Sequence, residues 1–308
     1  MHLSDFKTNI ILAPYTSLGV GGPADYFYEA KNEEDLTAAL KLVKEENISY
    51  IMLGGGTNVM VSDNGFRGLV IVARNNDFSI NGENIFAGAG CPLGVLVASS
   101  AKNGLAGLEW AAGLPGTLGG AIYGNAGTFG KSISDIISEV KIIDTEGKER
   151  IFNQQDCEFG YRKSIFQNTP GVVIVSAKLK MQHGDSTLLK GELKKNALWR
   201  LEHHPPYKSA GCIFRNSNPS PDAHLPLLET DQPKQWFDKV PSGWLIDKAG
   251  LKGSTNGGFI ISEVHGNFFI NNGTGTAKQL NELIEKAKKD VNEKFGVALE
   301  EEVRRIGF

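Results

Sequence analysis

Glycine clusters constrain this chain more than any other feature of its sequence. Nine glycines fall within the 27 residues from Gly104 to Gly130, and Gly54, Gly55 and Gly56 are consecutive. Glycine accounts for 37 of 308 residues, against an average near 7% in proteins. The clusters have no G-X-Y period, which excludes collagen, and they lie among apolar residues, which excludes a flexible linker. They predict loops whose backbone approaches another group closely.

Length, charge and cysteine usage exclude several classes of protein. A chain of 308 residues has a prior of about two domains. The net charge of −3 gives no sign of the basic excess typical of nucleic-acid binders. No apolar run approaches about 18 residues, and the N-terminus lacks a basic segment followed by a long apolar stretch, so we expect neither a membrane span nor a signal peptide. Cys91, Cys157 and Cys212 are far apart, and no HExxH motif occurs. We therefore expect no disulfide framework, no metal site, and a reducing, cytoplasmic setting.

Hydrophobic periodicity predicts mixed helix and strand structure, typical of an α/β or α+β fold. Residues 32–47 predict a helix capped by Asn32, and a second helix with an apolar stripe is expected after Thr276. The prolines and small residues of 203–211 indicate a domain junction, and the turn-rich segment 218–226 indicates a surface loop. Strands are expected at 49–53, 68–73, 138–145, 148–152 and 171–181.

Two patterns resemble nucleotide motifs but lack the required context. Residues 19–24 fit GxGxxA, yet a Rossmann motif should open a helix, whereas Pro23 leads into a strand-like segment. Residues 125–132 resemble the end of a P-loop, but Asn125 stands where the first glycine is required. Because each pattern fails a requirement of its motif, we expect neither a Rossmann enzyme nor a P-loop kinase.

Two other patches are better candidates for phosphate binding. A diphosphate needs several backbone N–H groups within reach, and side chains would block that approach. Gly54–Asn58 follows a predicted strand, and Gly113–Gly127 combines dense glycine with Thr117 and Asn125. The structural alternatives are a tight turn after a strand and a packing segment softened by glycine.

Four side chains are candidates for chemistry, each with a structural alternative. Cys212 lies between small residues, and a thiol with a free pKa of roughly 8.5 can donate a proton near neutral pH; the alternative is an inert buried thiol. Arg162 and His265 lie in aromatic-rich segments, where a packed arginine stem and a structural histidine are the alternatives. Glu302 could be a solvated charge, although the apolar residues that follow it indicate that the chain end is anchored.

Taken together, eight ordered segments resemble the UDP-N-acetylenolpyruvoylglucosamine reductases, flavoenzymes that complete UDP-N-acetylmuramate in peptidoglycan synthesis. The resemblance covers nearly the whole chain and is far more specific than any single motif. No extra tyrosine-bearing loop is present, so the shorter form of the family is the better match. The segments are 16–24, 53–71, 107–127, 159–166, 209–216, 243–253, 262–271 and 302–307.

The resemblance implies an α+β fold. An FAD-binding region of the vanillyl-alcohol-oxidase (PCMH) type, made of subdomains 1–75 and 76–200, would precede an α+β substrate-binding domain at 201–308. The C-terminal tail would return to the active site. NADPH would reduce bound FAD, and hydride would then pass to the enolpyruvyl double bond. The implied FAD-binding residues are Leu53, Gly54, Gly55, Gly56, Thr57, Asn58, Gly113, Pro115, Gly116, Thr117, Gly119, Gly120, Asn125, Ala126 and Gly127.

The resemblance also assigns roles to the candidate catalytic residues. Arg162 would bind the substrate carboxylate, Glu302 would polarise the same group through its protonated form or a water, and Cys212 would be the general acid. The family usually has serine at position 212, so the cysteine is a departure, as is the long, proline-rich stretch 218–240. The implied substrate-binding residues are Tyr161, Arg215, Asn216 and His265.

Two alternatives remain at this point. The chain could be a flavin oxidase of the same cofactor fold with another small substrate, although such an enzyme would not need the segments at 209–216 and 302–307 together. It could also be a nucleotide-binding regulator that has lost its chemistry, which the cysteine at position 212 favours. In the leading hypothesis the partners are small molecules (a UDP-sugar and NADPH), with no nucleic acid or membrane, and the chain is a monomer.

Overall fold

The computed structural model describes residues 1–218, 223 and 239–308, and these form two compact units. The predicted loop at 218–226 lies mostly outside the described residues. Unit 1 ends at Arg200, just before the predicted junction at 203–211. The expected three-part domain boundaries remain a prediction. Unit 1 comprises Met1–Ile10, Ala24–Gly56 and Arg67–Arg200, and unit 2 comprises Ile11–Pro23, Thr57–Phe66 and Leu201–Phe308.

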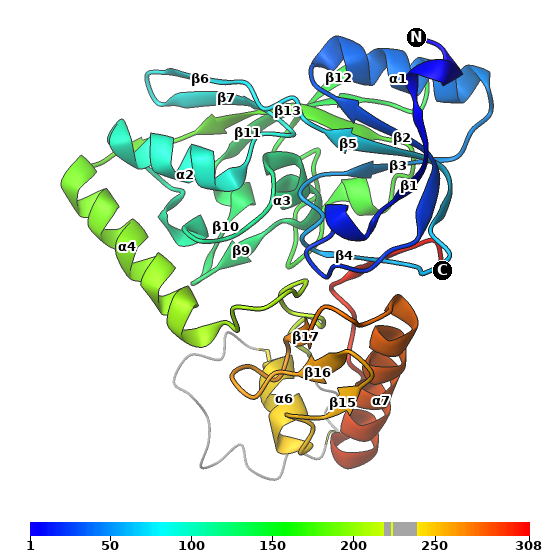
Figure 1. Cartoon of the computed structure of the whole chain (residues 1–308). Helices are drawn as coiled ribbons and strands as arrows, with labels where there is room; N and C mark the ends of the chain where they lie inside the picture. The colour runs from blue at the N-terminus through cyan, green and yellow to red at the C-terminus, as the bar shows by residue number, and fades with distance from the viewer. Residues whose placement is uncertain (219–222, 224–238) are drawn as a thin grey trace. The chain divides into compact units, whose positions relative to one another are not determined.

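The first sheet of unit 1 has the strand order β1-β2-β5-β3 (Figure 1). Its strands are β1 (Lys7–Ile11), β2 (Pro23–Ala30), β3 (Tyr50–Leu53) and β5 (Phe66–Ala73), and β3 runs parallel to β5. Helix α1 (Glu33–Glu45) begins after Asn32, whose side chain accepts a 2.7 Å hydrogen bond from the Asp35 N–H. The helix 32–47 and the strands at 49–53 and 68–73 are thus confirmed. Since β2 begins at Pro23, inside the GxGxxA pattern, the pattern opens a strand and not a helix, and the argument against a Rossmann motif is confirmed as well.

The second sheet of unit 1 is antiparallel, in the order β12-β11-β13-β7-β6. Its strands are β6 (Phe78–Asn81), β7 (Asn84–Gly88), β11 (Ile137–Ile143), β12 (Glu149–Asn153) and β13 (Val173–Lys180), which confirms the three strands expected beyond residue 137. Helices α2 (Leu93–Lys102) and α3 (Leu118–Gly124) pack their apolar residues into one core with this sheet. This core places α3 and the loops around it beside the sheet (Figure 1).

Unit 2 is built around helices α6 (Ser242–Lys248) and α7 (Ala277–Phe295) and the sheet β15 (Thr255–Asn256), β16 (Phe259–Ile261) and β17 (Phe269–Asn271). As predicted, Thr276 caps α7, and the expected apolar stripe of the helix is buried. Asp63 also accepts hydrogen bonds from the N–H groups of Ala277 (2.8 Å) and Lys278 (2.9 Å). Strand β4 (Val59–Val61) pairs in parallel with β18 (Arg304–Ile306). The anchored chain end that the sequence indicated is therefore present.

The remaining elements are short. Two-stranded pairs join β8 (Leu105–Ala106) to β14 (Gln182–His183) and β9 (Gly127–Thr128) to β10 (Lys131–Ser132). Helix α4 (Ser186–His203) ends in unit 2. The 3-10 turns are Leu3–Asp5, Ala13–Tyr15, Glu109–Ala111, Ile133–Asp135 and Ile165–Gln167. The whole is an α+β fold, as the resemblance implied.

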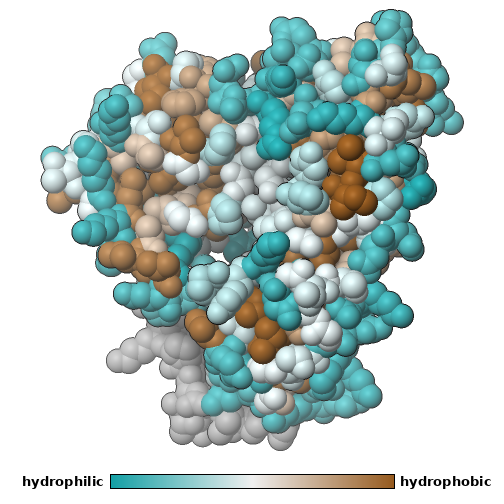
Figure 2. All heavy atoms as spheres, in the orientation of Figure 1, coloured by the Kyte–Doolittle hydropathy of each residue, from teal (hydrophilic) through white to brown (hydrophobic). Residues whose placement is uncertain are grey.

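Two further features concern the hydrophobicity of the helices and of the surface. Among the described residues, none of the helices has both the length and the apolar character that crossing a bilayer requires. On the face drawn in Figure 2, hydrophobic residues form small groups bordered by hydrophilic ones.

Candidate functional site

The two predicted phosphate-binding patches meet inside unit 1. A Cβ atom at Gly54 would lie 2.5 Å from Thr117 Oγ1 and 3.9 Å from the Gly120 nitrogen. A Cβ atom at Gly119 would likewise lie 2.8 Å from the Ala89 Cβ. Only glycine permits these approaches, because real Cβ contacts are longer. The glycines therefore let the end of β3 reach the start of α3.

The same patches fit a dinucleotide such as FAD. Gly56, Gly113 and Gly116 have φ angles of 63°, 79° and 126°, a region that strongly favours glycine. Loops of this kind expose successive N–H groups to a diphosphate without side chains in the way. Within unit 2, the Asn58 Nδ2 donates to the Glu302 carbonyl at 3.1 Å, while its buried Oδ1 has no partner among the described residues. Leu53 to Gly56 belong to unit 1, and Thr57 and Asn58 belong to unit 2.

Two of the predicted FAD-binding residues also have clear structural tasks. Asn125 ends α3 in the left-handed region (φ 41°), where asparagine is tolerated. Its Nδ2 donates to the Gly160 carbonyl at 2.8 Å, and its Oδ1 accepts from the Ser134 N–H at 3.3 Å. A Cβ atom at Gly127 would lie 2.5 Å from the Lys131 carbonyl oxygen across the β9–β10 pair. Asn125 thus connects the glycine-rich segment to the turn that carries Arg162.

Arg162 lies in a tight turn of unit 1. Gly160 and Lys163 exchange two backbone hydrogen bonds of 3.0 Å, which leaves Tyr161 and Arg162 as the central residues. Arg162 has a φ of 56°, a left-handed conformation that costs a non-glycine residue about 1 kcal/mol or more. Its guanidinium carbon lies 5.5 Å from the centre of the exposed Tyr161 ring. Strain of this kind persists only where neighbouring contacts fix it, and it is frequent at functional sites.

Two side chains fix this turn, and sequence reasoning missed both. Gln167 Nε2 donates to the Arg162 carbonyl at 3.1 Å and to the Tyr123 carbonyl at 2.8 Å. Ser164 Oγ donates to the same Tyr123 carbonyl at 2.7 Å. Tyr123 belongs to α3, so the arginine turn and the glycine-rich segment share one hydrogen-bonded network. No sequence signal could have singled out Gln167, because its task depends on carbonyls that only the fold brings near.

Cys212 and Glu302 are brought together inside unit 2. The Glu302 N–H donates to the Ile213 carbonyl at 2.7 Å, and the Arg215 N–H donates to the Glu300 carbonyl at 2.9 Å. The tail thus runs antiparallel to the segment that begins at the half-buried Cys212. Asn267 holds the other side of this segment through both hydrogen bonds of Phe214, at 2.9 and 2.7 Å. Two of the three predicted catalytic residues therefore lie on adjacent, paired backbones.

The predicted substrate-binding residues of unit 2 have different environments. The buried Nε of Arg215 has no hydrogen-bond partner among the described residues. Asn216 Oδ1 accepts from the Ser242 N–H at 3.4 Å. Burial lowers the pKa of His265, its Nδ1 accepts from the Asn267 N–H at 3.2 Å, and its ring centre lies 4.8 Å from that of Phe268. These contacts suit a neutral structural imidazole, the alternative that the sequence left open.

Arg200 was also missed. It is buried at the end of unit 1, donates to the carbonyls of Trp110 and Ala112, and lies 5.3 Å from the Phe129 ring. The Ala112 carbonyl directly precedes Gly113, so Arg200 fixes the entry to the second glycine-rich patch. An arginine in a helical pattern is usually a surface residue, and nothing in the sequence marks this one as buried.

Comparisons with known proteins agree with this arrangement. Residues 24–153 match the FAD binding domain family, and residues 203–306 match the family of the UDP-N-acetylenolpyruvoylglucosamine reductase C-terminal domain. The UDP-N-acetylenolpyruvoylglucosamine reductase of Solibacter usitatus is 40% identical over 96% of this chain and 95% of its own length, and that of Clostridioides difficile is 38% identical over 98% and 94%. The crystal structure of the Thermus caldophilus reductase superposes with a TM-score of 0.79 at 31% identity, covering 98% of this chain and 99% of its own. The chain therefore belongs to the UDP-N-acetylenolpyruvoylglucosamine reductase family.

Proposed function

We propose that Arg162, Glu302 and Cys212 carry the chemistry of this chain, which is the FAD-dependent reduction of UDP-N-acetylenolpyruvoylglucosamine in peptidoglycan synthesis. The match to an FAD binding domain and the relatives at 34–40% identity support the reaction. The observation that supports the site is the 2.7 Å hydrogen bond from the Glu302 N–H to the carbonyl of Ile213, the residue after Cys212. NADPH is our proposed reductant.

FAD would be held by the residues of the two glycine patches, including Gly54, Gly116 and Gly120. Bound FAD would supply the chemistry of hydride transfer between NADPH and the carbon–carbon double bond of the enolpyruvyl group. The residues of the chain must then stabilise the negative charge that develops on the substrate and donate the proton. Glycine at these positions leaves no side chain to block the approach of a diphosphate, and the positive φ of Gly116 and the close approach of Gly54 to Thr117 support this assignment.

Arg162 would bind the substrate carboxylate. Hydride added to the terminal carbon leaves negative charge on the carbon next to the carboxylate, and that charge spreads onto the carboxylate as an enolate. A guanidinium pairs with a carboxylate through two hydrogen bonds, and a preorganised donor typically lowers such a barrier by a few kcal/mol. Preorganisation is what the Gly160–Lys163 turn supplies, because the backbone of Arg162 is fixed before substrate arrives.

Glu302 and Cys212 would complete the reaction. A protonated Glu302, or a water that it holds, donates a further hydrogen bond to the carboxylate. The Cys212 thiol gives its proton to the carbon next to the carboxylate, and the thiolate regains a proton from solvent. Hydride and proton together saturate the double bond. Tyr161, Arg215 and Asn216 are proposed to contact the rest of the substrate, and the unpartnered Arg215 Nε supports this for Arg215.

We also propose a cytoplasmic monomer that acts on small molecules. No disulfide joins Cys91, Cys157 and Cys212, all of which lie in the described part of the chain, and this fits a reducing compartment. Light scattering coupled to size exclusion tests the monomer, which a stable dimer mass would contradict.

The two half-reactions of the purified protein test the proposal. The protein should show a flavin spectrum that NADPH bleaches and the enolpyruvyl substrate restores. Cys212→Ala should keep bleaching by NADPH but slow the restoration by about 10²-fold or more, since general acids contribute that much. Cys212→Ser is the matched control and should retain measurable turnover because a hydroxyl can also donate. Normal turnover of the alanine variant would show that Cys212 is not the acid.

A further inference from the structure

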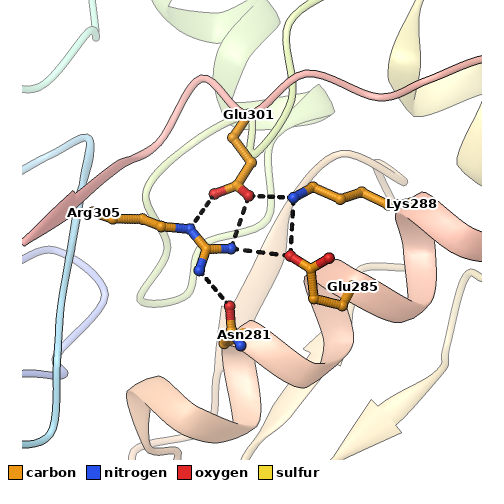
Figure 3. Close-up of polar contacts among 5 residues, drawn as sticks. All are labelled: Asn281, Glu285, Lys288, Glu301 and Arg305. Atoms are coloured by element: carbon orange, nitrogen blue, oxygen red, sulfur yellow. Dashed lines mark hydrogen bonds and ion pairs between the residues drawn. The ribbon is translucent and has the colours of Figure 1, made fainter. Parts of the chain in front are cut away.

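An ion-pair cluster connects the chain on both sides of Glu302 to helix α7 (Figure 3). Glu301 and Arg305, which flank Glu302, face each other in two parallel hydrogen bonds. Arg305 Nε lies 2.8 Å from Glu301 Oε2, and Arg305 Nη2 lies 2.8 Å from Glu301 Oε1. This is the bidentate geometry in which arginine pairs most strongly with a carboxylate.

Three residues of α7 complete the cluster. Lys288 Nζ lies 2.6 Å from Glu301 Oε1 and 2.9 Å from Glu285 Oε1. Arg305 Nη1 donates to Asn281 Oδ1 at 2.6 Å, and Nη2 lies 3.2 Å from Glu285 Oε1. Positions 281, 285 and 288 follow one face of the helix, because their spacings are four and three residues. The tail is thus tied to a single rigid surface.

The cluster is stronger than ordinary surface ion pairs, which contribute about 0–1 kcal/mol. Such pairs matter when the geometry is bidentate or several charges form a network, and here both conditions hold. The Glu301 side chain is only 15% exposed. Burial alone would raise its pKa, yet the hydrogen bonds from Arg305 and Lys288 hold the pKa of Glu301 below its ordinary value.

Backbone contacts hold the tail from Glu300 to Ile306, first to residues 213–215 and then to β4. Strand β18 pairs with β4 from Arg304 to Ile306 only, and two-stranded pairs are marginal by themselves. Glu302 precedes this strand and is held by two backbone contacts, its N–H to Ile213 and its carbonyl to Asn58 Nδ2. Both backbone groups of Glu302 are thus paired, and the side-chain cluster adds contacts at Glu301 and Arg305, on either side of it.

We infer that Arg305 and Glu301 are positioning residues that fix the backbone on both sides of Glu302 and so keep its carboxyl group in place for the reaction. The inference rests on the proposed role of Glu302. It assigns the cluster a task in the substrate half-reaction, which an ion pair that serves stability alone would not have.

The first test replaces Arg305 by methionine, which keeps the length of the side chain and removes the guanidinium. Stopped-flow spectroscopy follows bleaching by NADPH and restoration by the enolpyruvyl substrate separately. We expect restoration to slow about tenfold, because small displacements of a catalytic group cost 10²-fold or less. FAD content and the rate of bleaching should stay within about twofold of the parent, and the melting temperature within a few degrees. Arg305→Lys should fall between, since an ammonium cannot form the bidentate pair.

Lys286→Met is the matched control. Lys286 pairs with Asp290 on the same helix but does not contact the tail. Its removal should leave both half-reactions unchanged. Loss of FAD or equal slowing of both half-reactions in Arg305→Met would assign the cluster to stability and overturn the inference.

A double-variant cycle with Glu302→Gln separates the two claims. If Arg305 acts through Glu302, then Arg305→Met should add less than about twofold once Glu302 is already changed, because coupled residues are not additive. A full tenfold effect in both backgrounds would overturn the positioning role. If Glu302→Gln itself had no effect on restoration, the proposed role of Glu302 would fail, and the inference with it. A large effect of Glu302→Gln with none for Arg305→Met would sink the inference alone.

Discussion

The Arg162 turn in unit 1 and the Glu302 tail in unit 2 hold their functional side chains by opposite means. The turn depends on neutral donors, the amide of Gln167 and the hydroxyl of Ser164, that reach backbone carbonyls. The tail depends on charged groups that pair with one another, above all Arg305 with Glu301. The turn stores backbone strain at Arg162, whereas neither Glu302 nor its flanking residues adopt a positive φ.

The difference has a physical consequence. Neutral hydrogen bonds to carbonyls are insensitive to salt and to pH between the pKa values of the acidic and basic side chains. Partly exposed ion pairs weaken as salt screens them and as a carboxylate takes up a proton. The two regions should therefore respond differently to the same change of conditions, although both serve the same half-reaction in our proposal.

The largest expected effect is that of Arg162→Ala, which removes the functional group and leaves the turn. Restoration of the flavin spectrum by the enolpyruvyl substrate should slow by about 10²- to 10³-fold, the cost of losing one preorganised donor. FAD content and bleaching by NADPH should persist. Lys163→Ala is the control in the same turn, because Lys163 contributes its backbone groups to the turn. Equal loss of FAD and of activity in Arg162→Ala would point to a structural arginine.

A smaller effect is expected for Gln167→Ala, which leaves the arginine but removes the donor to its carbonyl. Restoration should slow about tenfold, and stability should fall by about 0.5–1.5 kcal/mol, the net contribution of a typical hydrogen bond, because the Arg162 carbonyl is only partly buried. Gln154→Ala removes a similar 2.9 Å amide-to-carbonyl bond, to Ser134, at an exposed site, and should change little. A fall in melting temperature with unchanged restoration would show that Gln167 stabilises the turn without positioning Arg162.

The Arg162 turn and the Glu302 tail should differ in how strongly salt affects the restoration rate. Raising sodium chloride from 0.05 to 0.5 M shortens the screening length to a few ångströms, so the tail cluster should weaken and restoration should slow about twofold. This cluster-dependent part should disappear in Arg305→Met and persist in Gln167→Ala. The difference between the variants is the measurement, because substrate binding itself also depends on salt. Identical salt dependence in all three proteins would show that the cluster does not govern the substrate step.

The smallest expected effect is a pH dependence of stability through Glu301. Its pKa is lowered in the folded protein, so the stability that it contributes is present above the unfolded-state pKa and is lost as pH falls through the lower, folded-state pKa. The parent should therefore melt about one to two degrees above Glu301→Gln near pH 7, and the gap should close in acid. A gap that does not change with pH would show that packing, and not charge, carries the contribution of Glu301.

The sequence predicted what local patterns determine. Helix α1 and its Asn32 cap, strands β3 and β5, and α7 with its Thr276 cap depend on periodicity and capping within a few residues. Arg162 and Cys212 were also identified as candidates, chiefly through resemblance. The sequence could not predict contacts between distant segments, such as Gln167 with Tyr123 and Arg200 with Trp110. No local pattern at either residue indicates which partner it contacts. The transfer of 57–66 to unit 2 has the same cause, since only pairing with residues near 304 reveals it.

The β4–β18 pair also affects the order in which parts of the chain can fold during synthesis. Every segment of unit 1 has been made by the time Arg200 is added, so this unit can fold while the chain is still growing. Strand β4, in contrast, is made early and must wait more than 240 residues for its partner at Arg304–Ile306. During that interval an early strand is exposed, a condition that invites aggregation and chaperone binding. Limited proteolysis of ribosome-bound chains should find unit 1 resistant before the 57–66 segment is, and simultaneous protection of both would contradict this order.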